Sequence, residues 1–199
     1  MIKIRDYDLP DAELLSGNGS GVDALVWVPS FFCIVLGQSN RPGDSIHVEA
    51  AEEGDIPVYK RPSGGESVIL SPNTLVISYI KRNEPLRSPR RYFSLVNGKI
   101  IETLSGLGVR GLGQRGISDI CIGDKKILGS SIYRNKDLVF YHGVLNISEP
   151  VSNLEKYLKH PPREPEYRGG RSHSEFVTSL FAEGYRIRAD AIKKALPLN

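Results

Sequence analysis

Short apolar segments that follow one another across tight turns constrain the fold of this chain more than any other feature. Val, Ile and Phe dominate the run from Ala24 to Leu36, which Pro29 divides into two expected strands. Further strands are expected over 56–59, 67–70, 74–80, 117–122, 126–132 and 138–147, several of them joined as hairpins. Neighbouring hairpins predict an α+β fold with a mixed, largely antiparallel sheet, and they argue against the repeated βαβ units of a doubly wound fold.

Helices are expected to flank this sheet. Apolar residues from Phe93 to Leu107 recur at helical spacing, with Ser88 and Pro89 as a start signal and Gly108 as a stop. A shorter helix is predicted over 47–53, and three more over 152–158, 175–183 and 189–196. Residues 1–22 are expected to be mostly loop.

The composition is that of an ordinary globular protein, with 199 residues, 40% hydrophobic and 25% charged. This length suits one domain, so a single catalytic domain over 1–199 is expected. The net charge of +3 does not indicate nucleic-acid binding, and the basic run from Lys81 to Arg91 has few interleaved aromatic residues. No leader or membrane-spanning run is apparent, so a cytoplasmic protein without membrane contact is expected.

The segment Arg61-Pro62-Ser63-Gly64-Gly65 is the first candidate for a functional loop. Adjacent glycines let a backbone approach a ligand closely, and nearby donors from Arg61 and Ser63 suit a negative charge. The alternative interpretation is an ordinary hairpin loop with a solvated arginine.

Lys126 is the second candidate, followed in the chain by Gly129-Ser130 and later by Tyr141-His142-Gly143. A lysine after a turn between apolar strands can place one compact cation over a phosphate or a developing oxyanion. Lysine also protects strand edges, a role that suits Lys125 in the turn better. A lone histidine such as His142 is often structural.

The order of these segments resembles the lipoate–protein ligase A family, within the biotin/lipoate protein ligase fold. In that family an apolar strand ends in a turn like Gly37–Asn40, and an Arg-x-Ser-Gly-Gly loop follows. The remaining motifs come in the same order, here as Pro72-Asn73-Thr74, Asp119-Ile120, Lys126–Ser130 and His142–Ile147. The resemblance extends over about residues 31–180.

The resemblance implies a role for each of these positions. Lys126 would be the essential cation that binds the carboxylate or acyl-phosphate oxygen, and Asp119 would contact the nucleotide part of an acyl-adenylate. The other implied substrate-binding residues are Arg61, Ser63, Gly64, Gly65, Asn73, Gly129, Ser130, His142 and Gly143. The resemblance implies no metal ligands among the side chains.

The implied activity is that of an ATP-dependent lipoate–protein ligase with a fold like the class II synthetases. Such an enzyme uses ATP and Mg²⁺ to convert lipoate, or octanoate, into an acyl-adenylate. It then transfers the acyl group to a lysine of a lipoyl carrier domain. The chain would be a short form without the family's C-terminal accessory domain, so a separate accessory subunit is an expected partner.

Two other functions stay open. An octanoyl or lipoyl transferase of this fold would take a carrier-bound acyl group through a cysteine thiolate, without ATP. The stretch 107–118, where such a thiol would lie, contains no cysteine, and Cys33 and Cys121 lie in apolar strands as expected core residues. A non-catalytic, ligase-like subunit is the second alternative.

The chain also departs from the family pattern. Glu66 replaces the third glycine of the loop, and Leu70-Ser71 replaces a His-Asp pair. His47 and Lys60 stand at two further altered positions. The changes at 66, 70 and 71 lie on the ligand side of the loop, where they bear on acyl-chain preference and adenylation.

Overall fold

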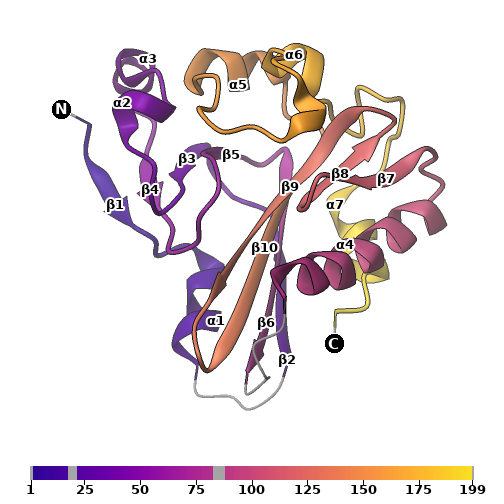
Figure 1. The fold of residues 1–199 in the computed structure, drawn as a ribbon. Helices are drawn as coiled ribbons and strands as arrows, with labels where there is room; N and C mark the ends of the chain where they lie inside the picture. The colour runs from indigo at the N-terminus through magenta and orange to yellow at the C-terminus, as the bar shows by residue number, and fades with distance from the viewer. Residues whose placement is uncertain (1, 18–21, 83–87, 199) are drawn as a thin grey trace.

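The strands of this protein form two sheets, which meet face to face along part of their length (Figure 1). A computed structural model describes residues 2–17, 22–82 and 88–198. Arg87, part of the basic run, lies outside the described residues. No helix in the described part of the chain is both long and apolar enough to cross a bilayer.

The smaller sheet contains four strands in the order β1-β4-β3-β5. Parallel pairing joins β1 to β4 and β4 to β3, whereas β5 pairs with β3 in antiparallel fashion. The bounds are β1 Ile4–Asp6, β3 Cys33–Leu36, β4 Val58–Lys60 and β5 Val68–Leu70. This sheet accounts for the mixed character that the sequence predicted.

The larger sheet contains six strands in the order β2-β6-β10-β9-β8-β7, and every neighbouring pair is antiparallel. The bounds are β2 Val22–Trp27, β6 Thr74–Arg82, β7 Leu112–Arg115, β8 Asp119–Ile122, β9 Lys125–Arg134 and β10 Leu138–Asn146. The expected α+β class with largely antiparallel pairing is confirmed, although the strands are divided between two sheets.

Helices surround the two sheets (Figure 1). Their bounds are α1 Glu13–Ser16, α2 Pro42–Ser45, α3 Val48–Glu53, α4 Pro89–Gly106, α5 Val151–Tyr157, α6 His173–Phe176 and α7 Ala189–Ala195, with 3₁₀ turns at Pro10–Ala12 and Glu166–Arg168. Of these, α5 and α6 lie above the sheets in Figure 1. The longest helix, α4, begins after Ser88 with Pro89 at its first position, as predicted.

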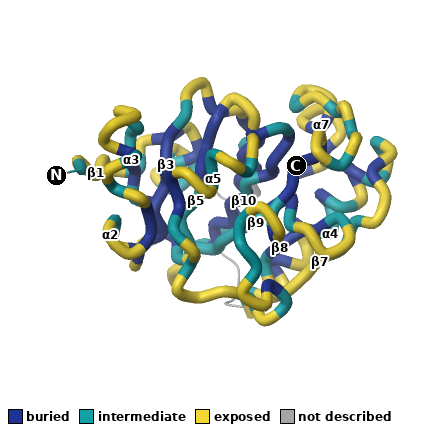
Figure 2. The backbone as a smooth tube through the Cα atoms, turned by 90° about the horizontal axis from the view of Figure 1, so that it is seen from above, coloured by how far each residue is buried: buried dark blue, intermediate teal, exposed yellow. Residues whose placement is uncertain are grey.

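Buried side chains hold these layers together. Val96, Ile100 and Leu104 of α4 pack with residues of α7 on the larger sheet. Between the two sheets, Val35 and Val76 belong to one buried cluster, so β3 and β6 face each other. Figure 2 shows the central strands buried and the surrounding helices and loops more exposed. The cavities described below lie between these two sheets.

Several predicted elements are wrong. The helix expected over 175–183 ends at Phe176, because Val177 makes a strand-like bridge with Lys126 and the Thr178 N–H donates to the Lys126 carbonyl. The stretch 112–115, for which no element was predicted, is the edge strand β7. Residues 4–6 and 10–16, also expected as loop, form β1, a 3₁₀ turn and α1. The turn before β9 contains only Gly123-Asp124, and Lys125 already pairs with Ile122.

Candidate active site

The loop from Arg61 to Glu66 is organised around the buried Arg61 guanidinium, which is 4% exposed. Its Nε donates to the Ser63 hydroxyl at 3.0 Å, and Nη1 donates to the Val35 carbonyl at 3.3 Å. Nη2 donates to the carbonyls of Gly64 and Glu66, both at 2.8 Å. Burial lowers the pKa of Arg61 to about 10, so the group still carries its charge at neutral pH. Arg61 is therefore neither solvated nor free, because each of its nitrogens is engaged by the protein.

Two glycines let this loop lie close to the strand β3. Gly65 has a φ of +88°, which disfavours any other residue. A Cβ placed on Gly37 would lie 1.9 Å from the Gly65 carbonyl oxygen. The double-glycine signal in the sequence thus reflects a close backbone approach, here between two segments of the protein.

His142 of β10 reaches this loop from the larger sheet. Its Nε2 lies 2.5 Å from the Ser63 hydroxyl, and the Ser63 hydroxyl also lies 3.0 Å from that of Ser131. On the other side of the ring, Nδ1 lies 3.8 Å from the Asp11 carboxylate. Burial lowers the pKa of His142, so the ring is neutral at neutral pH.

Asp11 is fully buried and is held by two hydroxyl groups. Tyr7 donates to one carboxylate oxygen at 2.8 Å, and Ser78 donates to the other at 2.7 Å. Ser63, His142 and Asp11 thus follow the order of a catalytic triad, but Ser63 is 1% exposed and its oxygen has three polar partners. A hydroxyl so enclosed suits a structural hydrogen-bond chain better than a nucleophile.

Lys126 lies at the start of β9, and its side chain extends along the strand toward Gly129. Its ammonium is 2.9 Å from Asp119 Oδ1, and its side chain is 28% exposed. A Cβ placed on Gly129 would lie 2.7 Å from Lys126 Cε and Nζ, so only glycine leaves room for this conformation. Ser130 donates to the Ser118 carbonyl at 2.6 Å, which fixes the neighbouring strand end. The sequence pattern Lys-x-x-Gly-Ser therefore has a geometric reason.

Two cavities adjoin at Lys126. The larger has a volume of about 450 Å³, and Arg61, Asp119, Gly129, Ser130 and His142 all contribute to its lining. The smaller has a volume of about 160 Å³ and lies under α5 and α6. Residues that line both are Glu66, Ser67, Val68, Lys126, Gly129, Val144 and Pro165. Lys126 is therefore the lysine that the two linings share.

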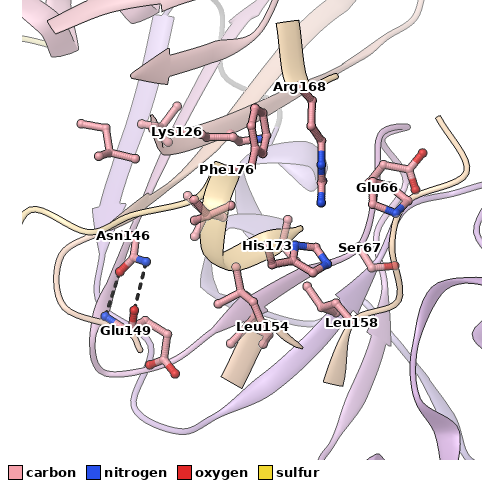
Figure 3. Close-up of a pocket in the computed structure, with 18 of the residues that line it drawn as sticks. Glu66, Ser67, Lys126, Asn146, Glu149, Leu154, Leu158, Arg168, His173 and Phe176 are labelled. Carbon is pink, nitrogen blue, oxygen red and sulfur yellow. Dashed lines mark hydrogen bonds between the residues drawn. The ribbon is translucent and has the colours of Figure 1, made fainter. Parts of the chain in front are cut away.

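The walls of the two cavities differ in chemistry. Aliphatic side chains dominate one side of the larger cavity: Val35, Val68, Leu70, Val76 and Val144. The smaller cavity has both apolar and cationic lining residues: Ile69, Leu128, Leu154 and Phe176 are apolar, and Lys159, Arg163 and Arg168 are cationic. The two kinds adjoin, since the Arg168 guanidinium lies 4.8 Å from the Phe176 ring centroid. Figure 3 shows Arg168 and His173 directed toward this space, with Glu66 and Ser67 beside it.

Two predicted residues lie apart from the cavities. Asn73 donates to the Glu149 carboxylate at 3.2 Å, and its carbonyl accepts from the N–H groups of Ile147 and Ser148, so it joins the start of β6 to the end of β10. A Cβ on Gly143 would lie 2.7 Å from the Tyr141 hydroxyl. Neither residue lines either cavity, so their contact with substrate stays a prediction that these cavities do not support. Ser63, Gly64 and Gly65 also line neither cavity, and the first two accept hydrogen bonds from Arg61.

Sequence reasoning missed three residues of the site. Asp11 and Tyr7 lie in the segment expected to be loop, and nothing in their spacing marks them. Tyr167 donates to Asp119 Oδ2 at 2.7 Å, and Pro165 and Glu166 next to it line the larger cavity. Tyr167 precedes Arg168-Gly169-Gly170, and both glycines have positive φ. A pair of adjacent glycines is also the sequence signal in the segment Arg61–Gly65.

The two cysteines are buried, as predicted. Burial raises the pKa of Cys33 to about 12 and also raises that of Cys121, whose Sγ lies 3.6 Å from the Tyr167 hydroxyl. Neither thiol is therefore ionised at neutral pH.

Among the described residues, no three His, Cys, Asp or Glu side chains come together in a way that could hold a metal ion.

Comparison with known proteins gives a consistent result. Residues 15–197 match the family described as the lipoyl protein ligase A/B catalytic domain. The lipoate-protein ligase A of Psychrobacter cryohalolentis is 24% identical over 163 residues, which is 82% of this chain and 46% of that protein. This chain thus spans about half the length of that curated relative.

Solved structures share the fold. A chain of the bi-partite lipoate protein ligase from Thermoplasma acidophilum, studied with its E2 lipoyl domain, has a TM-score of 0.80 at 19% identity, covering 94% of this chain and 72% of that one. A lipoate-protein ligase A bound with ATP has a TM-score of 0.79 at 17% identity, covering 98% of this chain and 81% of that one. At these identities the likeness concerns the fold alone.

Proposed function

Because the chain belongs to the lipoyl protein ligase A/B catalytic domain family, we propose that it activates lipoate or octanoate with ATP and transfers the acyl group to a protein lysine. The observation that carries this proposal is the position of Lys126, which lines both cavities. An acyl-adenylate has an apolar chain on one side of an acyl phosphate and a nucleoside on the other. One cation between two differently lined spaces suits such a molecule.

The larger cavity is the proposed site of the acyl chain. Its aliphatic wall, which includes Val35, Val68 and Val144, matches a hydrocarbon chain. The Arg61–Glu66 loop closes one side of this space through its own hydrogen bonds. In this proposal Arg61 shapes the pocket, and Lys126 meets the carboxylate.

The smaller cavity is the proposed site of the nucleotide. Leu154 and Phe176 offer apolar surface for a flat base, and Lys159, Arg163 and Arg168 bring positive charge suited to phosphates. Mg²⁺ would reach the site as a complex with the ATP phosphates, since this ion usually keeps water and phosphate ligands.

The proposed chemistry has two steps. A carboxylate oxygen of the acyl substrate attacks the α-phosphorus of ATP, the bond to the bridging oxygen breaks, and pyrophosphate leaves. The lysine amine of the acceptor then attacks the acyl carbonyl carbon, the bond to the phosphate oxygen breaks, and AMP leaves while the nitrogen loses a proton to solvent. Lys126 would stabilise negative charge on oxygen in both steps.

A lipoyl carrier domain is the proposed acceptor, and a separate accessory subunit is a proposed partner. The structural relative from Thermoplasma acidophilum is described as bi-partite and was studied with its E2 lipoyl domain. The likeness to that protein motivates both partners here.

The proposal is tested by mass spectrometry of a recombinant lipoyl domain incubated with this chain, lipoate, ATP and Mg²⁺. We expect the domain to gain one lipoyl group only when ATP is present. Octanoyl transfer from an acyl carrier protein without ATP would replace the ligase proposal with the transferase alternative. If neither reaction occurs, even from preformed lipoyl-adenylate, the non-catalytic alternative is favoured.

The two half-reactions are expected to differ in their need for a partner. Transfer from preformed lipoyl-adenylate should proceed with the chain alone, because Lys126 and the loop are in place. Adenylation should be slow until an accessory subunit is added. Pyrophosphate release and lipoyl-domain modification, measured separately, test this prediction. Fast adenylation by the chain alone would show that no partner is required.

The cysteines are expected to be dispensable. A Cys33→Ala/Cys121→Ala double variant should lose about 1–3 kcal/mol of unfolding free energy, because small buried groups are removed. Its lipoylation rate should stay within about threefold of the parent, because neither thiol is ionised. Chemical denaturation and the mass assay measure the two quantities. A folded Cys121→Ala variant without activity would restore the thiol mechanism.

A further inference from the structure

The segment Glu164–Phe176, called here the clamp segment, is tied to the hairpin that carries Lys126. Tyr167 donates to Asp119 of β8, and Arg171 Nη1 lies 3.0 Å from Asp124 Oδ2 in the turn between β8 and β9. Just after the segment, the Thr178 N–H donates to the Lys126 carbonyl at 2.9 Å. In Figure 1, α6 lies beside the ends of β8 and β9.

Asp119 is where the clamp segment meets the proposed chemistry. Oδ2 accepts from Tyr167 at 2.7 Å. Oδ1 is 2.9 Å from the Lys126 ammonium and accepts from the Ser118 hydroxyl at 3.4 Å. A carboxylate held at a single oxygen can turn about its Cβ–Cγ bond, which would move the ammonium that it pairs with. With both oxygens engaged, that rotation would break one contact, so the two contacts fix one orientation.

The Tyr167 ring is itself held in place. Its centroid lies 5.2 Å from that of Phe176, and the phenol edge sits against Gly116, where a Cβ would lie 3.3 Å from Tyr167 Cε1. Burial, followed by the charge of Asp119, raises the pKa of Tyr167 well above its usual range. The phenol therefore keeps its proton and acts as the donor.

We propose that Tyr167 is a positioning residue that orients the Asp119 carboxylate and, through it, the Lys126 ammonium at the junction of the two cavities. This inference rests on the proposed function, since it assigns Tyr167 to the same reaction. Tyr167 touches neither cavity itself, so its effect reaches the substrate only through Asp119 and Lys126. A displacement of the cation by about 1 Å costs catalysis much more than it costs binding.

A simpler role for Tyr167 would be to hold the clamp segment over the smaller cavity. The two roles predict different kinetic effects when the Tyr167 hydroxyl is removed. A loosened segment disturbs the wall that Arg168 and Phe176 contribute, which raises the KM for the ligand held there. A misplaced ammonium lowers kcat with little change in KM. Arg171 anchors the segment through Asp124 and through the Tyr167 backbone carbonyl, which accepts from Nη2 at 2.9 Å. It contacts neither the Tyr167 hydroxyl nor Asp119, so it supplies the comparison.

The experiment compares three variants in the transfer of lipoate from preformed lipoyl-adenylate to a lipoyl domain. Tyr167→Phe removes only the hydroxyl, and we expect kcat to fall ~10- to 100-fold with KM within about threefold. Tyr185→Phe, which removes a hydroxyl that accepts from the Arg110 N–H away from the site, should match the parent. Arg171→Gln should raise KM more than it lowers kcat. A Tyr167→Phe profile equal to that of Tyr185→Phe or Arg171→Gln would overturn the proposal.

A second readout does not depend on enzymatic activity. Acetic anhydride acetylates free amines, and mass spectrometry of peptides compares Lys126 with its neighbour Lys125. In Tyr167→Phe, Asp119 Oδ2 loses its hydrogen bond and only the contacts of Oδ1 remain. The ion pair is then less firmly oriented, so we expect Lys126 to react ~3-fold faster or more relative to Lys125, with no change in Tyr185→Phe. An unchanged ratio in a folded variant contradicts the inference. If the parent chain transfers no lipoate but this ratio changes, the proposed function fails while the positioning role stands.

Discussion

Lys126→Ala is expected to abolish lipoylation, with a loss of ~100-fold or more in rate from preformed lipoyl-adenylate. Lys126 lines both cavities. Among the described residues, it is the only lysine that lines the larger cavity. Alanine removes the charge that the acyl-phosphate oxygens would meet. Because the side chain is partly exposed, the fold should tolerate the change. Single-turnover transfer, followed by mass spectrometry, measures the loss.

Lys125→Ala is the matched control for this variant. Lys125 is adjacent in sequence, begins the same strand and is exposed, and it lines neither cavity. Its rate should stay within about threefold of the parent. Equal, mild effects of the two substitutions would remove Lys126 from the proposed mechanism, and with it the main support for a ligase.

The sequence predicted the strands of this fold and the helices α4, α5 and α7 better than its N-terminal segment and the stretch after Phe176. β6 and β10 are long apolar runs bounded by clear turn residues, and both lie where expected. The segment after Phe176 has helical composition, but pairing with Lys126 keeps Val177 extended. A tertiary contact of this kind leaves no periodic pattern, so local propensity gave the wrong element.

The candidate site was predictable to a similar extent. Arg61, Asp119 and Lys126 all line the larger cavity. The sequence motifs could not distinguish residues that line this cavity from neighbouring residues that only support its walls. Gly143 lies next to His142 in sequence, but alternation along β10 turns it to the other face. Asp11 and Tyr167 come from distant segments that only the folded chain brings to the site. Their contacts depend on topology rather than on spacing.

Arg61 gives the second large prediction, because the structure assigns its guanidinium to the protein rather than to a ligand. Arg61→Ala removes the partner of three carbonyls and one hydroxyl in a region that is nearly closed to solvent. Unsatisfied buried acceptors are costly, so we expect the unfolding free energy to fall by about 3–5 kcal/mol. Urea denaturation measures this change. Activity should be lost together with the loop.

Arg61→Lys separates this structural role from direct contact with substrate. Lysine keeps the positive charge but cannot bridge four acceptors with fixed planar geometry, so this variant should also lose stability, by about 2 kcal/mol or more. Arg41→Lys, at an exposed position, should cost less than about 0.5 kcal/mol. If Arg61 served mainly to bind the acyl phosphate, Arg61→Lys would keep the parent's stability and raise only the KM. That result would return Arg61 to the list of substrate contacts, and the loop would need another explanation for its closed conformation.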